Sequence, residues 1–216
     1  MPRIVFKSLK DQVSDYVRHE IDEGRLKDGD RVVEASISDN LGVSRTPVRE
    51  ALIQLAGDGY LCYESRRGFR VRGCDEKSAR EIFEMLGPLD GRAAYLALPQ
   101  MNDAAINHLV ELCNNMDEAI GRRDAKAYDD LQHEFHFSYI DRCGNERLAA
   151  SIDELERFFS KRSYEKAADE VFANFTKANK EHRRIIQLFR ERDAHALQDY
   201  VRDVHWSIDT AHYATW

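Results

Sequence analysis

The sequence lacks long apolar runs and is poor in cysteine. No stretch approaches the roughly 18 to 20 consecutive apolar residues that a membrane-spanning helix needs, and the opening MPRIVFKSLKDQ lacks the apolar segment of a secretory signal. We therefore expect a cytoplasmic protein without a membrane partner. The four cysteines include no CxxC pair, which argues against a zinc ribbon or a disulfide framework. They are Cys62, Cys74, Cys113 and Cys143.

The charge of the chain is divided unevenly. Of 216 residues, 43% are hydrophobic and 33% are charged, which fits a globular chain of two modest domains. Residues 1–74 carry 13 Lys and Arg against 12 Asp and Glu, a balance of +1. The remainder carries 19 against 27, so it holds the acidity behind the net charge of -7. The total charge therefore does not indicate a surface that binds nucleic acid, and clusters of arginines are the relevant signal.

Three helices are predicted early in the chain. Apolar residues recur at helical spacing from Phe6 through Leu9 to Ile21, and Gly24 can end this helix in the left-handed conformation. A short second helix, marked by Ile37, stops at Gly42. A third begins with Ser44 as its cap, tolerates Pro47 in its first turn, and continues to Leu55.

The second and third helices have the layout of a helix-turn-helix. They are joined by LGVS, and the third opens with Arg45, Thr46 and Arg49, where a recognition helix meets the major groove. An arginine can donate two hydrogen bonds to guanine, while the hydroxyl groups of Ser44 and Thr46 can reach phosphates. These residues are therefore candidate contacts to double-stranded DNA.

A basic hairpin follows the third helix. The segment GDGYLCYESRRGFRVRG predicts two short strands around a turn at Arg67 and Gly68. Arg66, Arg67, Arg70 and Arg72 fall within it, as expected of a wing that tracks the DNA backbone or enters the minor groove. Residues 1–74 are thus predicted to form a winged helix-turn-helix domain with a small β-hairpin wing, in a chain that is mainly α.

The stretch RVVEASISDNLGVSRTPVREALIQL, from Arg31 to Leu55, closely resembles the DNA-binding domain of the GntR family of regulators. The resemblance implies operator contacts from Arg45, Thr46 and Arg49, with Gly68 close to DNA. Some relatives carry another arginine early in the second helix, but the nearest position here is Ala35.

Residues 75–216 are predicted to form an all-α helical bundle. Apolar residues return at helical spacing, with little Gly or Pro, and Pro88 should kink the first helix or be accommodated by a local break. The predicted segments are 76–98, 103–121, 124–142, 145–163, 165–191 and 193–212.

The histidines of the bundle are candidate metal ligands. Gln132 and His136 lie four residues apart on one helix face, Asp129 lies one turn earlier, and His182 and His205 belong to later helices. Three converging imidazoles and one oxygen would suit zinc or nickel, and open coordination positions could hold a ligand carboxylate. A structural role for each histidine is the alternative, because spacing alone does not show convergence.

The same region resembles the C-terminal FCD domain of the FadR subfamily of GntR regulators, through FHFSYIDRCGN, KEHRRII and DVHW. The resemblance implies dimerisation and effector binding. It also implies a metal site formed by His136, His182 and His205, with Gln132 where metal-binding members have Asp. The effector-binding arginine of many members is replaced by Leu86, which leaves Arg92 and Arg162 as anchors for an acidic effector.

We therefore predict a homodimeric transcriptional regulator, acting as a repressor on a palindromic operator and modulated by a metabolite acid. Three alternatives remain open. The helical part could be a purely structural dimerisation domain, or a metal enzyme, although Asp130 with His133 is only a single near match to a di-iron motif. A redox sensor would use Cys62 and Cys74 beside the wing.

Overall fold

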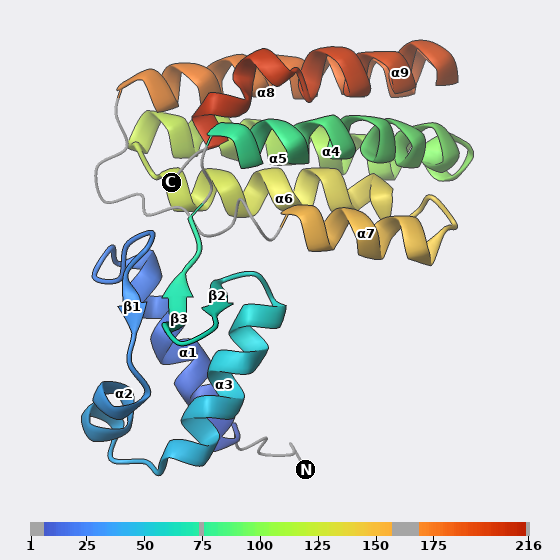
Figure 1. Ribbon diagram of the computed structural model, residues 1–216. Coiled ribbons are helices and arrows are strands. Elements are labelled where there is room, and N and C mark those ends of the chain that lie inside the picture. The colour runs from blue at the N-terminus through green and yellow to red at the C-terminus, as the bar shows by residue number, and fades with distance from the viewer. Residues whose placement is uncertain (1–6, 74–75, 157–168, 215–216) are drawn as a thin grey trace, which may run out of the picture. The chain divides into compact units, whose positions relative to one another are not determined.

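The computed structural model describes residues 7–73, 76–156 and 169–214 (Figure 1). The chain divides into two compact units, each of which is described by itself. The described part of the first unit is residues 7–73, and that of the second is residues 76–156 and 169–214. Cys74 and Arg162 lie outside the described residues.

The first unit contains the three predicted helices. Helix α1 (Leu9–Asp22) begins with a capping box between Ser8 and Asp11, and Gly24 follows its end with a φ of +65°. Helix α2 (Glu34–Leu41) ends at Gly42, also at a φ of +65°. Helix α3 (Arg45–Gly57) has Ser44 as its N-cap residue, but the Ser44 side chain makes no capping hydrogen bond. The prediction of Ser44 as the N-cap residue is therefore correct, but the prediction that its side chain caps the helix was wrong.

The sheet of the first unit has three antiparallel strands in the order β1-β3-β2. Strands β2 (Leu61–Glu64) and β3 (Gly68–Val71) form the predicted hairpin, with Arg66 and Gly68 at positive φ near its turn. Strand β1 (Arg31–Val32) pairs with β3 and was not predicted, because two residues cannot show an alternating pattern.

Apolar side chains from the helices and the sheet form one core in this unit. Leu9 does not join it: 53% of its surface is exposed, so the expectation that it shares the buried face of α1 was wrong. Leu9 is the first residue of α1. The buried residues are Val13, Val17, Ile21, Val32, Ile37, Val48, Ala51, Leu52, Leu55, Leu61, Phe69 and Val71.

The described residues of the second unit are helical and contain no strand (Figure 1). The mainly α fold class, with a winged helix-turn-helix and a helical bundle, is confirmed. Helix α4 continues through Pro88 without interruption, and none of the described helices is long and apolar enough to cross a membrane. The helices are α4 (Glu76–Ala97), α5 (Asp103–Arg122), α6 (Ala125–Ile140), α7 (Glu146–Glu156) and α8 (Asp169–Glu191).

The last predicted helix, 193–212, is not continuous. Helix α9 (Ala194–Tyr200) passes into a π-helical turn, η2 (Val201–His205), and a 3₁₀ segment, η3 (Ile208–Ala214), follows. A π turn inserts one residue into the helical repeat and rotates the side chains that follow it. His205 is the last residue of this turn and Trp206 follows it, and both side chains are buried.

Helix α4 packs closely against α9 and η2. A Cβ atom on Gly91 would lie 2.7 Å from the carbonyl oxygen of Gln198, and one on Gly87 would lie 2.8 Å from that of Arg202. Only glycine permits this approach of two backbones. The close packing brings the buried face of α4, including Asp90, against the segment that carries His205.

Candidate functional site

Three buried histidines from separate elements converge inside the second unit. His136 comes from α6, His182 from α8 and His205 from the end of η2, and their exposed fractions are 1%, 0% and 8%. One ring nitrogen from each lies within 4.8 Å of the others. The Nε2 atoms of His136 and His205 are 3.1 Å apart. We call these three residues the histidine cluster.

A buried carboxylate that sequence reasoning missed lies behind His136. Asp90, on α4, is 0% exposed, and its Oδ2 lies 2.8 Å from Nδ1 of His136. The Trp206 Nε1 group donates to the same oxygen at 2.7 Å, and the Tyr139 hydroxyl donates to Oδ1 at 2.7 Å. Asp90 is therefore hydrogen-bonded on both oxygens.

The Asp90 network fixes the protonation of its members. Burial by itself would raise the pKa of Asp90, but the His136 ring and the three hydrogen bonds lower it below the usual carboxyl value. Burial likewise opposes the charge of His136, yet the Asp90 carboxylate raises the pKa of that imidazole. Burial and Asp90 together raise the pKa of Tyr139 well above its ordinary value, so its hydroxyl stays a donor.

A second carboxylate lies behind His205. Glu181 Oε2, on α8, is 3.2 Å from the Nδ1 atom of His205. Burial lowers the pKa of His205, and the hydrogen bond from Glu181 opposes this without reversing it. His205 thus faces Glu181 with one ring nitrogen and His136 with the other.

His182 has neither of its ring nitrogens hydrogen-bonded among the described residues, although the side chain is fully buried. Burial, followed by the neighbouring His205 and His136 rings, lowers its pKa well below the ordinary value and keeps it neutral. An unsatisfied buried polar group costs about 1 to 3 kcal/mol. A neutral imidazole with a free lone pair is also the form that binds a metal ion.

The donor set fits a divalent cation. Zinc binds histidine nitrogens at about 2.0 to 2.1 Å, which places two tetrahedral ligand atoms roughly 3.3 Å apart. The observed 3.1 Å between His136 and His205, with the unpartnered His182 beside them, is close to that arrangement. Three histidine nitrogen ligands suit zinc or nickel and would leave coordination positions for water or a small molecule.

The other predicted ligands, Asp129 and Gln132, lie on α6 with His136. Asp129 is not in the group of His, Cys, Asp and Glu side chains whose ligand atoms lie within 4.8 Å of one another. Gln132 is half-buried one turn before His136, and its side chain has no hydrogen bond within the described ranges. His133 is exposed and bonds Glu156 at 2.9 Å, so it belongs to a surface pair outside the cluster.

Of the two predicted effector anchors, one is exposed and the other lies outside the described residues. Arg92 is exposed, and its guanidinium lies over the ring of Tyr95 at 4.7 Å from the ring centre. Leu86, which the resemblance aligns with an effector-binding arginine, is fully buried. Arg162 is not in the described ranges.

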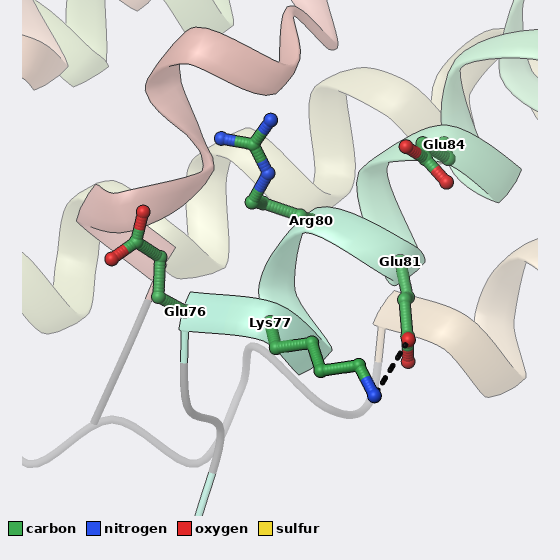
Figure 2. A pocket seen from close by; sticks show the side chains of 5 residues that line it. All are labelled: Glu76, Lys77, Arg80, Glu81 and Glu84. Carbon is green, nitrogen blue, oxygen red and sulfur yellow. Dashed lines mark ion pairs between the residues drawn. The ribbon is translucent and has the colours of Figure 1, made fainter.

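A surface pocket on α4 does not resemble a site for a small organic molecule. Figure 2 shows its five lining side chains, all charged and all from the first turns of this one helix. Lys77 and Glu81 are paired at 3.5 Å, and none of the three cluster histidines lines the pocket. Ligand sites are usually concave and largely apolar. The pocket lining is Glu76, Lys77, Arg80, Glu81 and Glu84.

In the first unit, the N-terminal turn of α3 presents the predicted DNA-contacting residues together. Ser44, Arg45, Thr46 and Arg49 are all exposed. Within the described part of the chain, the two arginines have no ion-pair partner and the Ser44 hydroxyl has no hydrogen bond. First-turn backbone N–H groups of a helix have no partner inside it and favour an anion such as phosphate.

The arginines of the wing divide into two kinds. Arg66 is exposed at the turn, and the exposed Arg67 side chain lies 3.6 Å from Glu64. Gly68 is half-buried at the start of β3 with a φ of +82°. Arg70 instead turns toward the domain, where its Nη1 group donates to the carbonyl oxygen of Gly29 at 2.6 Å. Among the described residues, Arg66 therefore has no ion-pair partner, whereas Arg67 and Arg70 each contact another residue of the domain.

Two family matches cover most of the chain. Residues 9–71 match the family described as bacterial regulatory proteins, gntR family, and residues 81–204 match the FCD domain. Among curated proteins, the HTH-type transcriptional regulator YdhC of Bacillus subtilis is 26% identical over 88% of this chain and 84% of its own. The regulator McbR of Escherichia coli is 27% identical over 68% and 67%.

Solved structures show the same fold. The E. coli McbR/YncC structure has a TM-score of 0.70 at 22% identity and covers 93% of this chain and 94% of its own. The transcriptional regulator GntR from Rhodococcus sp. RHA1 has a TM-score of 0.69 at 20% identity, covering 94% and 98%.

Proposed function

Because this chain belongs to the GntR family of bacterial transcriptional regulators and carries an FCD domain, we propose that it is a homodimeric repressor whose operator binding depends on a metal-bound effector. The relatives are transcriptional regulators and not enzymes. The finer assignment rests on one observation: three buried histidines converge, and one of them, His182, has no partner among the described residues for either ring nitrogen.

In this proposal the winged helix-turn-helix supplies the DNA contacts. Arg45 and Arg49 reach base edges in the major groove, Ser44 and Thr46 bind phosphates, and Arg66, Arg67 and Gly68 approach the backbone or the minor groove. Two copies in a dimer would place their recognition helices about one DNA turn, roughly 34 to 36 Å, apart. A palindromic operator follows from that symmetry.

The helical domain supplies the response. His136, His182 and His205 hold a zinc or nickel ion, and a carboxylate-bearing metabolite takes an open position on it. Effector binding in the helical domain changes the affinity for the operator only if the effector prefers one arrangement of the DNA-binding domains. The exposed Arg92 is less suited to anchor this acid, because its guanidinium already lies over Tyr95.

The metal part of the proposal is tested by elemental analysis and thermal shift of the full chain, before and after chelation and with added Zn²⁺ or Ni²⁺. We expect about one ion per chain in the wild type and none in His182→Ala. His195→Ala is the matched control, because it removes an exposed histidine on α9. Wild-type protein that neither retains nor binds an ion would leave the helical domain with a purely structural role.

The DNA part is tested by selecting genomic fragments with the purified protein. We expect a palindromic site bound by two chains. Selection of an asymmetric site bound by one chain would contradict the proposed dimeric repressor.

A further inference from the structure

Two of the three histidines in the cluster are each hydrogen-bonded to a carboxylate from another helix. Asp90 of α4 meets Nδ1 of His136 at 2.8 Å, and Glu181 of α8 meets Nδ1 of His205 at 3.2 Å. His182 has no hydrogen-bonded carboxylate among the described residues. The cluster therefore contains two carboxylate–histidine pairs and one free imidazole.

The carboxylates determine which ring nitrogens carry hydrogen. An ionised carboxylate only accepts hydrogen bonds, so the nitrogen that faces it must be the donor. On His136, Nδ1 also lies 2.7 Å from the Tyr139 hydroxyl oxygen, whose own hydrogen is donated to Asp90. Nδ1 therefore carries a hydrogen in both His136 and His205, which leaves Nε2 of each ring as the atom available to a metal ion.

Those two Nε2 atoms face each other. The Nε2 atoms of His136 and His205 are 3.1 Å apart. A hydrogen on one of the two nitrogens bridges them in the metal-free protein, and a metal ion that replaces it would be shared by both rings. The carboxylates thus pre-orient the rings for a positive charge located between them.

We propose that Asp90 and Glu181 are positioning residues of the metal site, each holding its histidine with Nε2 toward the ion while remaining outside the ligand set. The inference rests on the proposed function, because it concerns the same cluster. Both Asp90 oxygens are already bonded, to His136 and Trp206 on one side and to Tyr139 on the other.

Asp90 also supplies the negative charge that Gln132 does not. A carboxylate hydrogen-bonded to a metal-binding histidine raises the basicity of the ring and fixes its orientation. The charge that balances a divalent ion therefore comes from α4, through His136, and not from position 132 on α6.

The test measures Zn²⁺ and Ni²⁺ affinity of the metal-free full chain by competition with a chromogenic chelator. Loss of an outer carboxylate typically lowers metal affinity by about 10- to 100-fold, and we expect a decrease of that order in Asp90→Asn. The amide that replaces the carboxylate has one acceptor oxygen and cannot serve all three donors. Glu181→Gln should give a smaller decrease, because its hydrogen bond is longer at 3.2 Å.

Glu134→Gln is the matched control, because it removes a carboxylate that lies 3.3 Å from the exposed His108 and should leave affinity unchanged. Should Asp90→Asn fail to fold, nitrogen NMR of metal-free wild-type protein provides a second readout. We expect His136 to carry its hydrogen on Nδ1, and a hydrogen on Nε2 alone would overturn the inference.

The outcomes separate the two proposals. Wild-type binding with weaker binding in Asp90→Asn supports both. Equal binding in the wild type and Asp90→Asn overturns the role of Asp90 and leaves the metal site standing. No binding in the wild type overturns the metal site and this inference together.

Discussion

Replacing Gly87 with alanine would place a methyl group 2.8 Å from the carbonyl oxygen of Arg202 and 3.3 Å from Cβ of Trp206. The first contact is with backbone, so η2 must move by several tenths of an ångström. Overpacking of this kind costs about 1 to 3 kcal/mol, while alanine in a helix gains about 1 kcal/mol over glycine. We expect a net loss of about 1 kcal/mol in the free energy of unfolding.

Gly121→Ala is the matched control, because Gly121 lies in α5 and a Cβ there would meet nothing within 4 Å. It should stabilise the protein by up to about 1 kcal/mol. Denaturant unfolding of both metal-free variants with equal slopes gives the comparison. Since Trp206 donates to Asp90, Gly87→Ala should also weaken zinc binding. A Gly87→Ala protein as stable as Gly121→Ala would refute the close-packing argument.

Three further predictions follow from individual side chains. Arg45→Ala and Arg49→Ala should each lower operator affinity by about tenfold, since a base contact contributes about 1 to 3 kcal/mol. Fluorescence anisotropy measures this affinity. An unchanged midpoint of thermal unfolding shows that each variant is still folded. Arg70→Ala should instead lower the midpoint of thermal unfolding, because it removes the hydrogen bond to Gly29. An unchanged midpoint with a large loss of DNA affinity would contradict a structural role for Arg70. The lowered pKa of His182 should make metal-free protein lose stability as pH falls below the ordinary histidine value of 6.5, because the unfolded chain then takes up a proton that the folded chain does not. His182→Gln should show a smaller loss in urea titrations across that range, and an identical pH profile would argue against a buried neutral ring.

The DNA-binding unit was largely predictable because its signals are local. Gly42 and Ser44 mark the boundaries of adjacent helices, and the arginine-rich hairpin follows within the same short stretch. Strand β1 escaped prediction because it consists only of Arg31 and Val32, and its pairing with β3 depends on residues far along the chain.

The three histidines of the cluster were predictable, but their surroundings were not. Spacing and resemblance identified His136, whereas Asp90 lies 46 residues earlier on another helix. One signal could have found it: Asp90 is a charged residue within the stripe of buried positions that includes Leu86 and Ala94. An acid on the apolar face of a helix needs a buried partner.

The final helix shows a different limit. Periodicity predicted one helix over 193–212, because a single inserted residue barely disturbs an apolar pattern. The π turn at Val201–His205 nevertheless determines where His205 and Trp206 point. Its presence depends on tertiary packing against α4, which sequence periodicity does not contain.

The central claim is that an ion held by the histidine cluster changes DNA binding. It is tested most directly by measuring the affinity of the full chain for its selected operator, first metal-free and then with saturating Zn²⁺ or Ni²⁺, in the wild type and in His182→Ala. The account predicts a metal-dependent change in the wild type that His182→Ala lacks. An operator affinity that is the same with and without metal in the wild type would contradict it.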